Sequence, residues 1–269
     1  MIGKNLIVLI AHYNNLEGLE KTLLSIDEPF DVDIMIVDDG SETKPTLNHL
    51  KSIYTKGEVF LELLPKNQGV GIAANHGLSL IQKMDYELIA RLDCGDLNKP
   101  NKYQKQLDYL NRNPDVMVLG TWADIVNENG DFMFVLEFPT EYEKIKKKMF
   151  VNSMFINPTV IFRKKILDTI GLYKYEYRHA AQDYAFYFDA VKKFKCENLP
   201  ESLLVYVIEE KSISTQKRKL QVKNRIKIIL NHFEFGFYPI YSLLRNSFLY
   251  FISRDLSNKL KKLTNFNNG

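Results

Sequence analysis

The sequence predicts an α/β fold with a mostly parallel central sheet flanked by helices, a Rossmann-like first half and a C-terminal helical extension. Apolar segments of strand length alternate with segments of helical period through residues 5–98. These apolar segments are nearly continuous, which is typical of parallel strands buried on both faces. The chain has 269 residues, 45% hydrophobic and 26% charged, so it can bury a full core and is not disordered as a whole.

The first half contains four predicted strands separated by three predicted helices. The strands are residues 5–11, 32–37, 59–64 and 87–92. The first helix follows a cap at Asn14 or Asn15, and the second begins near Pro45. The third helix, residues 69–83, contains the small residues Ala73, Ala74 and Gly77. We therefore expect this third helix to pack closely on the sheet.

Polar clusters follow three of these strands. They are His12-Tyr13-Asn14, Asp38-Asp39, and Asp93 with Asp96. Ligands of parallel α/β sheets bind beyond the carboxyl ends of the strands, so these clusters are expected at one ligand-binding edge.

The second half is less regular. A helix is expected at residues 99–113 and a strand at 116–121, followed by a turn at 127–130 between two apolar runs. A basic helix at 144–150, a strand at 159–162, a helix at 182–195 and an extended segment at 199–208 complete this half.

The last part of the chain differs in charge and periodicity. From residue 211 onward, 12 Lys and Arg stand against two acids, whereas the preceding residues carry 24 basic and 31 acidic side chains. Six apolar residues follow three- and four-residue steps, namely Phe237, Ile240, Tyr241, Leu244, Phe248 and Phe251, and Lys259, Lys261 and Lys262 come after them. This pattern predicts an amphipathic helix that either contacts an anionic membrane surface or packs back on the domain. No recognised nucleic-acid motif is present, so no nucleic-acid partner is expected.

Composition also indicates in which cellular compartment the protein is expected. No run of about 18 uncharged apolar residues predicts a spanning helix, and the first apolar run is interpreted as a strand rather than a signal peptide. Only Cys94 and Cys196 occur, which fits a reducing compartment. We expect a cytoplasmic protein, with contact to the inner face of the plasma membrane through residues 214–269.

Each acidic cluster has two interpretations when it is taken alone. Asp38 and Asp39 either accept hydrogen bonds from a nucleotide or form a turn with a helix cap. Asp93 and Asp96 either share a hard cation with substrate phosphates or form a polar turn in which Asp96 caps the next helix. Asp183 is either a general base beside aromatic residues or an acid favoured by the first helical turn.

The order of the motifs resembles the inverting nucleotide-sugar glycosyltransferases of family two, whose fold is called GT-A. The matching segments run from residue 6 to about 214 and are LIVLIAHYNN, IMIVDDGSETKPT, PKNQGVGIAANHGL, ELIARLDCGDLNKPNKYQKQLDYL, NPTVIFRKKILDTIGLY, QDYAFYFDAVKKF and LPESLLVY. The resemblance implies a catalytic domain at residues 1–213, with a nucleotide-sugar donor half at 1–98 and an acceptor half at 99–213. Residues 214–269 form a basic, aromatic tail that the resemblance does not cover.

The resemblance also implies roles for individual residues. The set assigned to the nucleotide-sugar is Ala11, Tyr13, Asp39, Asn67, Asn75 and Asp93, with Tyr13 stacking on the base and Asp39 accepting its imide hydrogen, which favours uridine or thymidine donors. Asp93 and Asp96 would hold Mn²⁺ or Mg²⁺ without the further acid that the family usually has where Gly95 stands. Asp183 would deprotonate the acceptor. Either Glu209 joins the metal site or Lys211 reaches the phosphates.

The function that this resemblance implies is sugar transfer with inversion to a hydroxyl group. The donor would be a UDP- or dTDP-sugar, and the acceptor a glycan or lipid-linked saccharide of a bacterial surface polysaccharide such as lipopolysaccharide or capsule. Two alternatives are a nucleotide-sugar-binding or scaffold protein with a decayed metal site, and a nucleotidyltransferase, although His12-Tyr13-Asn14-Asn15 offers no glycine-rich phosphate loop. The donor sugar, the linkage and the oligomeric state are left open.

Overall fold

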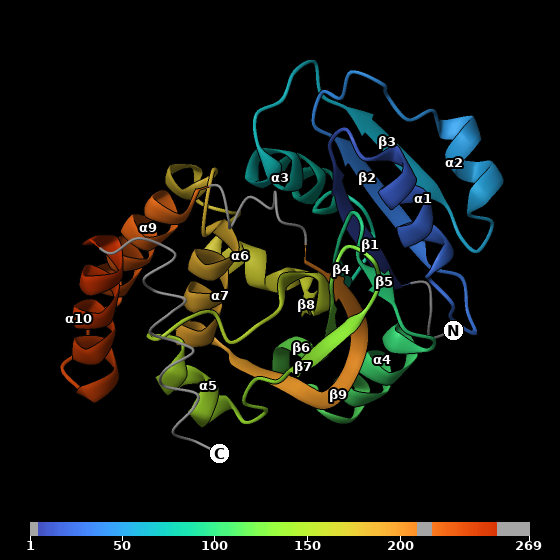
Figure 1. Ribbon diagram of the computed structural model, residues 1–269. Helices are drawn as coiled ribbons and strands as arrows, with labels where there is room; N and C mark the ends of the chain where they lie inside the picture. Colours follow the sequence, from blue (N-terminus) through green and yellow to red (C-terminus); the bar gives the residue numbers. More distant parts are fainter. Residues whose placement is uncertain (1–4, 209–216, 252–269) are drawn as a thin grey trace.

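The computed structural model describes residues 5–208 and 217–251 and has an α/β fold with a curled central sheet flanked by helices (Figure 1). The sheet within these residues is nine-stranded, in the order β3-β2-β1-β4-β8-β6-β9-β5, with β7 paired to β6. The predicted fold class is therefore confirmed.

The first half of the chain forms the parallel part of the sheet. Its strands are β1 (Leu6–His12), β2 (Asp33–Asp38), β3 (Val59–Leu63) and β4 (Leu88–Asp93). The helices between them are α1 (Leu16–Leu24), α2 (Leu47–Ile53) and α3 (Val70–Ile81). Asn15 caps α1, because its side-chain oxygen accepts a hydrogen bond from the Gly18 N–H at 3.0 Å.

The second half extends the sheet with mixed pairing. Its elements are β5 (Leu97–Asn98), α4 (Lys102–Arg112), β6 (Val116–Val126), β7 (Phe132–Leu136), α5 (Tyr142–Lys148), β8 (Ile161–Arg163), α6 (Leu167–Ile170), α7 (Gln182–Lys193) and β9 (Lys195–Val207). Strand β8 is antiparallel to both β4 and β6, and β9 is parallel to β6. Strands β6 and β7 are antiparallel, and the predicted turn at 127–130 lies between them.

Helix α4 is not capped by Asp96, which the turn interpretation of that residue proposed. Instead, the buried carboxylate of Glu28 accepts hydrogen bonds from the backbone N–H groups of Tyr103 and Gln104, at 2.7 and 2.9 Å. These are free N–H groups of the first helical turn, so a carboxylate from a distant segment satisfies them. No local sequence pattern indicates this contact.

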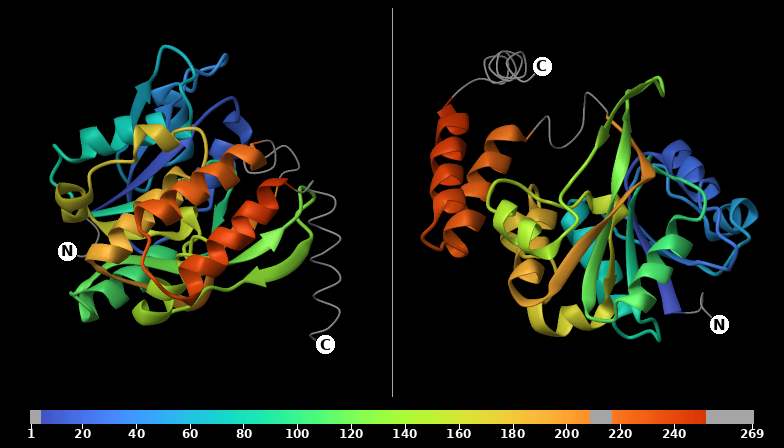
Figure 2. Two further views of the ribbon diagram at one scale, coloured as in Figure 1. Left: turned by 90° about the vertical axis from the view of Figure 1, so that its left-hand side faces the viewer. Right: turned by 90° about the horizontal axis from the view of Figure 1, so that it is seen from below.

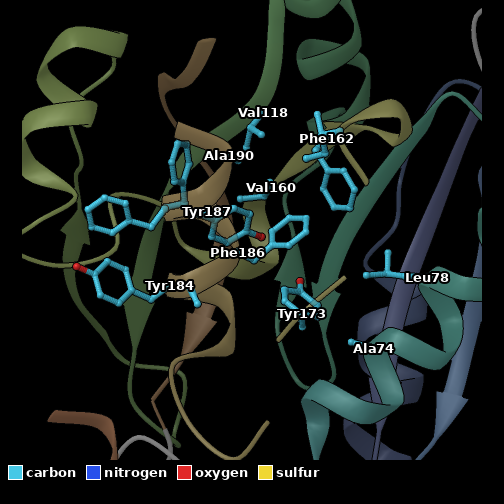
Figure 3. Close-up of a cluster of buried hydrophobic side chains, with 14 of the residues drawn as sticks. Ala74, Leu78, Val118, Val160, Phe162, Tyr173, Tyr184, Phe186, Tyr187 and Ala190 are labelled. Atoms are coloured by element: carbon cyan, nitrogen blue, oxygen red, sulfur yellow. The ribbon is translucent and has the colours of Figure 1, made fainter. Parts of the chain in front are cut away.

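Two hydrophobic clusters cover the two faces of the sheet. Ile7 and Leu9 of β1 belong to one cluster, and Leu6, Val8 and Ile10 belong to the other, as the two-residue period of a strand requires. The first cluster includes α3 and the aromatic residues of α7 (Figure 3). The second includes buried residues of α1 and α4.

The predicted close packing of α3 depends on Gly77. A Cβ atom at this position would lie 2.4 Å from Leu9 Cδ1 and 3.0 Å from Val37 Cγ2. Those distances are shorter than normal van der Waals contacts, so only glycine allows α3 to lie this close to β1 and β2.

The described residues of the C-terminal extension form two helices, α9 (Arg218–Asn231) and α10 (Phe237–Phe251), which lie side by side beyond α7 (Figures 1 and 2). Ile228 and Ile229 of α9 are fully buried in the first cluster. Lys259, Lys261 and Lys262 lie outside the described residues. Among the residues that the structure describes, we find no helix with the length and hydropathy needed to cross a membrane.

Candidate functional site

The polar clusters that follow β1, β2 and β4 lie along one edge of the sheet, as the sequence predicted. Strand β1 lies between the other two strands. Its register places Ala11 opposite Asp93 and His12 opposite Asp38. The carboxyl ends of three parallel strands therefore bring together residues that are up to about eighty positions apart in the sequence.

Asp38 has a structural role at this edge. Its Oδ1 atom lies 2.7 Å from His12 Nδ1, and its Oδ2 accepts a hydrogen bond from the Ser41 N–H at 3.0 Å. His12 Nε2 accepts from the Asn15 N–H at 3.2 Å, so the other ring nitrogen carries the hydrogen and donates it to Asp38. Both side chains are buried, and the turn interpretation describes Asp38 correctly.

Asp39 connects the end of β2 to the start of α3. Its two carboxylate oxygens accept hydrogen bonds from the N–H groups of Gln68 and Gly69, at 2.9 and 2.7 Å. Burial raises the pKa of Asp39, and these two hydrogen bonds oppose that effect. Each oxygen keeps a second lone pair, so acceptance of a hydrogen from a bound base remains chemically available. Asn67, in the preceding loop, is exposed.

Tyr13 and Asn75, two other residues assigned to the donor, occupy different environments. Tyr13 is 47% exposed, so its ring is accessible for stacking. Asn75 instead joins α3 to the segment before α7, because its side-chain amide donates to the Tyr173 carbonyl at 2.7 Å and accepts from the Tyr173 N–H at 2.9 Å. In the structure, Asn75 therefore holds a neighbouring segment in place.

Asp93 lies at the end of β4 and is held by a side-chain amide and a buried cation. The Asn157 amide nitrogen lies 3.1 and 3.2 Å from its two carboxylate oxygens. The Arg91 guanidinium is 3.5 Å from Asp93 Oδ1 and only 1% exposed. The Asn157 carbonyl oxygen accepts from the Tyr187 hydroxyl at 2.9 Å, which fixes the direction of its amide group.

Asp96 follows on a turn that glycine makes possible. Gly95 has a φ angle of +102°, a conformation that residues other than glycine rarely adopt. The position where the family usually has a further acid therefore has a backbone conformation that suits glycine. The Thr22 hydroxyl accepts from the Gly95 N–H and donates to the Asp96 carbonyl, both at 2.9 Å. Asp96 is buried, and its Oδ1 accepts from the Val207 N–H at 3.2 Å.

Asp93 and Asp96 offer the carboxylate oxygens that Mg²⁺ prefers, and such a cation commonly takes its remaining ligands from water and donor phosphates. Within residues 5–208 and 217–251, no group of three or more His, Cys, Asp and Glu side chains is arranged to hold a metal. Glu209 and Lys211, the two proposed neighbours of the diphosphate, lie outside the described residues.

Asp183 is the second residue of α7, and Ala181, the residue before this helix, has a left-handed φ angle of +63°. Burial raises the pKa of Asp183, and the nearby negative charge of Asp93 raises it further. A carboxyl group with a raised pKa is a better proton acceptor than an ordinary exposed aspartate.

The segment before Asp183 also contacts the start of α3. A Cβ atom on Gly71 would lie 3.2 Å from Arg178 Cα and 3.5 Å from Gln182 Cγ. Asp39 holds the N-terminal end of α3, and Asp183 interacts electrostatically with Asp93. The predicted acidic residues therefore belong to one connected region.

Sequence reasoning missed Arg91 and Asn157. Arg91 is a single charged residue in the apolar segment LIARLD, two positions before Asp93, and that isolated charge was an available signal. Asn157 lies in a quoted segment, but nothing local in the sequence indicates its contact with Asp93, 64 residues earlier.

An α/β sheet of this order, with acidic residues gathered beyond its parallel strands, defines the class of protein as a GT-A-type glycosyltransferase. The family model described as "Glycosyl transferase family 2" matches residues 7–171, and the chain belongs to this family.

Curated relatives agree with this assignment. The chain is 29% identical to the O-antigen biosynthesis glycosyltransferase WbnJ of Escherichia coli over 194 residues, which is 71% of this chain and 72% of the relative. It is 28% identical to the UDP-Gal:alpha-D-GlcNAc-diphosphoundecaprenol beta-1,3-galactosyltransferase of Escherichia coli over 226 residues, which is 82% of this chain and 76% of that protein.

Solved structures show the same fold. S. aureus TarS 1–349 in complex with UDP-GlcNAc has a TM-score of 0.69 and 19% identity, covering 91% of this chain and 73% of that one. Against another structure of TarS, the chain spans only 44% of the other protein's length. A mannosyltransferase from Pyrobaculum calidifontis in complex with GDP-Man and Mn²⁺ has a TM-score of 0.63 and 15% identity, covering 90% of this chain and 68% of that one.

Proposed function

We propose that this glycosyltransferase moves a sugar from a UDP- or dTDP-sugar to a hydroxyl group of a glycan or lipid-linked acceptor, with inversion, during synthesis of a bacterial surface polysaccharide. The observation that supports the proposal is the electrostatic interaction of Asp183, an acid with a raised pKa, with Asp93 at the end of β4. The names of the two Escherichia coli relatives support the polysaccharide and the lipid-linked acceptor.

The donor would bind across the ends of β1, β2 and β4. Tyr13 would stack on the base, and Asp39 would accept its imide hydrogen through a remaining lone pair. Ala11 and Asp93, which are neighbours in the register of β1 and β4, would border the ribose and diphosphate. Asn67 and Asn75 would border the donor from the side of α3.

Asp93 and Asp96 are the residues that would hold Mn²⁺ or Mg²⁺. A bound cation of this kind offsets negative charge on a leaving diphosphate. The chain itself contributes the geometry, because the Asn157 amide and the Arg91 guanidinium hold Asp93 in place before any donor arrives.

Asp183 would act as the general base. It would remove the proton of the acceptor hydroxyl as that oxygen forms a bond to the anomeric carbon. The bond between this carbon and the diphosphate oxygen would break at the same time, and its electron pair would leave with the phosphate. Attack from the face opposite the diphosphate inverts the anomeric centre and requires no covalent intermediate.

The decisive experiment replaces Asp183 by asparagine. Asp183→Asn keeps the size of the side chain but removes its basicity, so donor binding should persist while sugar transfer falls by at least about 100-fold. Binding is measured by thermal shift with UDP-, dTDP- and GDP-sugars, with and without Mn²⁺. Asp168→Asn, at an exposed position on α6, is the matched control and should transfer normally.

Normal transfer by Asp183→Asn would remove Asp183 as the base. Donor binding without any transfer by the wild-type protein would favour the binding or scaffold alternative. A wild-type protein that binds none of the nucleotide-sugars would refute the proposed function as a whole.

Helix α10 supports a peripheral location at the inner face of the plasma membrane. Phe237, Leu244 and Phe251 are 75, 68 and 84% exposed, whereas its buried side includes Ser242 and Asn246. The apolar face of this helix is thus turned toward solvent, which favours membrane contact over packing on the domain.

Substitution tests this membrane contact better than deletion, because the tail includes the buried residues Ile228 and Ile229. The double variant Leu244→Glu/Phe248→Glu should lose most of its co-sedimentation with vesicles rich in phosphatidylglycerol. Leu220→Glu, at a 37% exposed apolar position on α9, is the control. Unchanged sedimentation of the double variant would refute contact through α10.

A further inference from the structure

Helix α9 contacts the segment that carries Asp183. The Asn224 side chain is only 4% exposed, and its amide donates a hydrogen bond of 2.8 Å to the carbonyl of Ala180, which is itself buried. The next residue, Ala181, has the left-handed φ angle of +63°, and α7 begins one residue later with Gln182 and Asp183. Asn224 therefore holds the chain at the point where its direction into α7 is set.

The far end of α9 is attached to the domain by separate contacts. Asn231 donates a hydrogen bond of 3.2 Å to the Tyr177 hydroxyl. His232 stacks on Phe188 with ring centroids 4.3 Å apart, and its Nε2 lies 3.2 Å from Asp189 Oδ1. Because the contacts of His232 and the buried Ile228 and Ile229 fix α9 along α7, the contact between Asn224 and Ala180 has a rigid support even without the Asn231 hydrogen bond.

Arg225 follows Asn224 and brings a positive charge toward Asp183. This charge lowers the pKa of Asp183, against burial and Asp93, which raise it. Asp183 also lowers the cost of burying the Arg225 guanidinium. Arg91 of β4, Tyr187 of α7 and Tyr173 also interact electrostatically with Asp183.

We propose that Asn224 is a positioning residue for Asp183, so that α9 supports the catalytic centre. Asn224 acts through the backbone of residues 180–181. Helix α9 lies beyond residues 7–171, which the family model matches. This inference rests on the proposed role of Asp183 as the base and deepens it.

The first test compares two substitutions on the same helix. Asn224→Ala and Asn231→Ala each remove one amide hydrogen bond, but only the first bond holds the segment next to Asp183. Asn224→Ala should lower kcat by about tenfold or more and leave the donor KM within about twofold. Asn231→Ala should keep kcat within about twofold. Equal kcat values for the two variants would overturn the inference.

A second measurement does not depend on activity. Amide hydrogen exchange at residues 181–184 should become faster in Asn224→Ala and stay unchanged in Asn231→Ala. Equal exchange in both variants would overturn the role of Asn224. The proposed function would be refuted if the wild-type protein showed no transfer activity or if Asp183→Asn were active. In either case the comparison of hydrogen exchange would still decide whether α9 holds residues 181–184.

Discussion

Lys102, on the buried side of the Asp96 turn, makes the stability of the protein depend on pH. Its ammonium group is fully buried and donates hydrogen bonds to Asn98 Oδ1 and to the Pro158 carbonyl, at 2.8 and 2.7 Å. Burial lowers the pKa of Lys102 from 10.5 to about 7, although Asp96, Glu28 and Asp93 oppose this change. The folded protein therefore releases a proton that the unfolded chain retains up to its higher pKa.

The magnitude follows from the two pKa values. A shift from 10.5 to about 7 corresponds to a free energy of about 5 kcal/mol that opposes folding. This cost is fully present below pH 7 and disappears as the pH rises toward 10.5, because the unfolded state binds more protons in that interval. The contribution of Lys102 to the free energy of unfolding should thus rise by about 2 kcal/mol between pH 7 and pH 9.

Urea denaturation of wild type and Lys102→Met at several pH values isolates this contribution. In Lys102→Met the pH-dependent contribution of Lys102 to the free energy of unfolding is absent, and two hydrogen-bond acceptors also lose their donor. The test is therefore the slope of the free energy of unfolding against pH, and not the difference in stability at one pH. Lys105→Met, at an exposed position on α4, is the matched control and should keep the wild-type slope. Parallel curves for wild type and Lys102→Met would refute the reasoning.

Three further predictions concern the site and its support. The kcat of the wild-type enzyme should fall at acidic pH, with a midpoint above the usual pKa range of an aspartate, because Asp183 must be ionised to accept a proton and its pKa is raised. A midpoint within the usual range would contradict this role. Asn157→Leu should lower donor affinity by about tenfold in titration calorimetry, since Asp93 loses its amide partner, and unchanged affinity would contradict this support. Gly77→Ala should destabilise the protein by about 1–3 kcal/mol in urea denaturation, since its Cβ would approach Leu9 Cδ1 to 2.4 Å, whereas Gly236→Ala has space and should not.

The order of strands and helices was predictable because it depends on local periodicity. The apolar runs that became β1, β2, β3 and β4 bury side chains on both faces of the sheet, and such segments show their character without knowledge of their neighbours. The acidic residues that follow them were predictable for a related reason, because parallel strands point their carboxyl ends in the same direction.

Contacts between distant segments were not predictable in this way. Glu28 caps α4, Asn157 holds Asp93, and Asn224 holds Ala180, and none of these contacts has a sequence spacing that identifies it. The different roles of the neighbouring residues Asp38 and Asp39 were also not predictable from local sequence. Both looked equally able to bind a nucleotide, but His12 and Ser41 use Asp38 for the turn. The choice depends on which way each side chain faces at the end of β2.

The acidic site also needs buried positive charge, and one source of this charge lies in the C-terminal helices. Asp93, Asp96 and Asp183 would repel one another in an environment of low dielectric constant. Arg91 lies near Asp93 and Asp183, Lys102 interacts with Asp96, and Arg225 interacts with Asp183. The first two cations come from β4 and α4, but the third comes from α9. Burial and the repulsion from Asp93 raise the pKa of Asp183, and the charge of Arg225 opposes both effects. A carboxyl group accepts a proton only while it is ionised, so a base with a raised pKa benefits from a nearby cation that favours its ionised form.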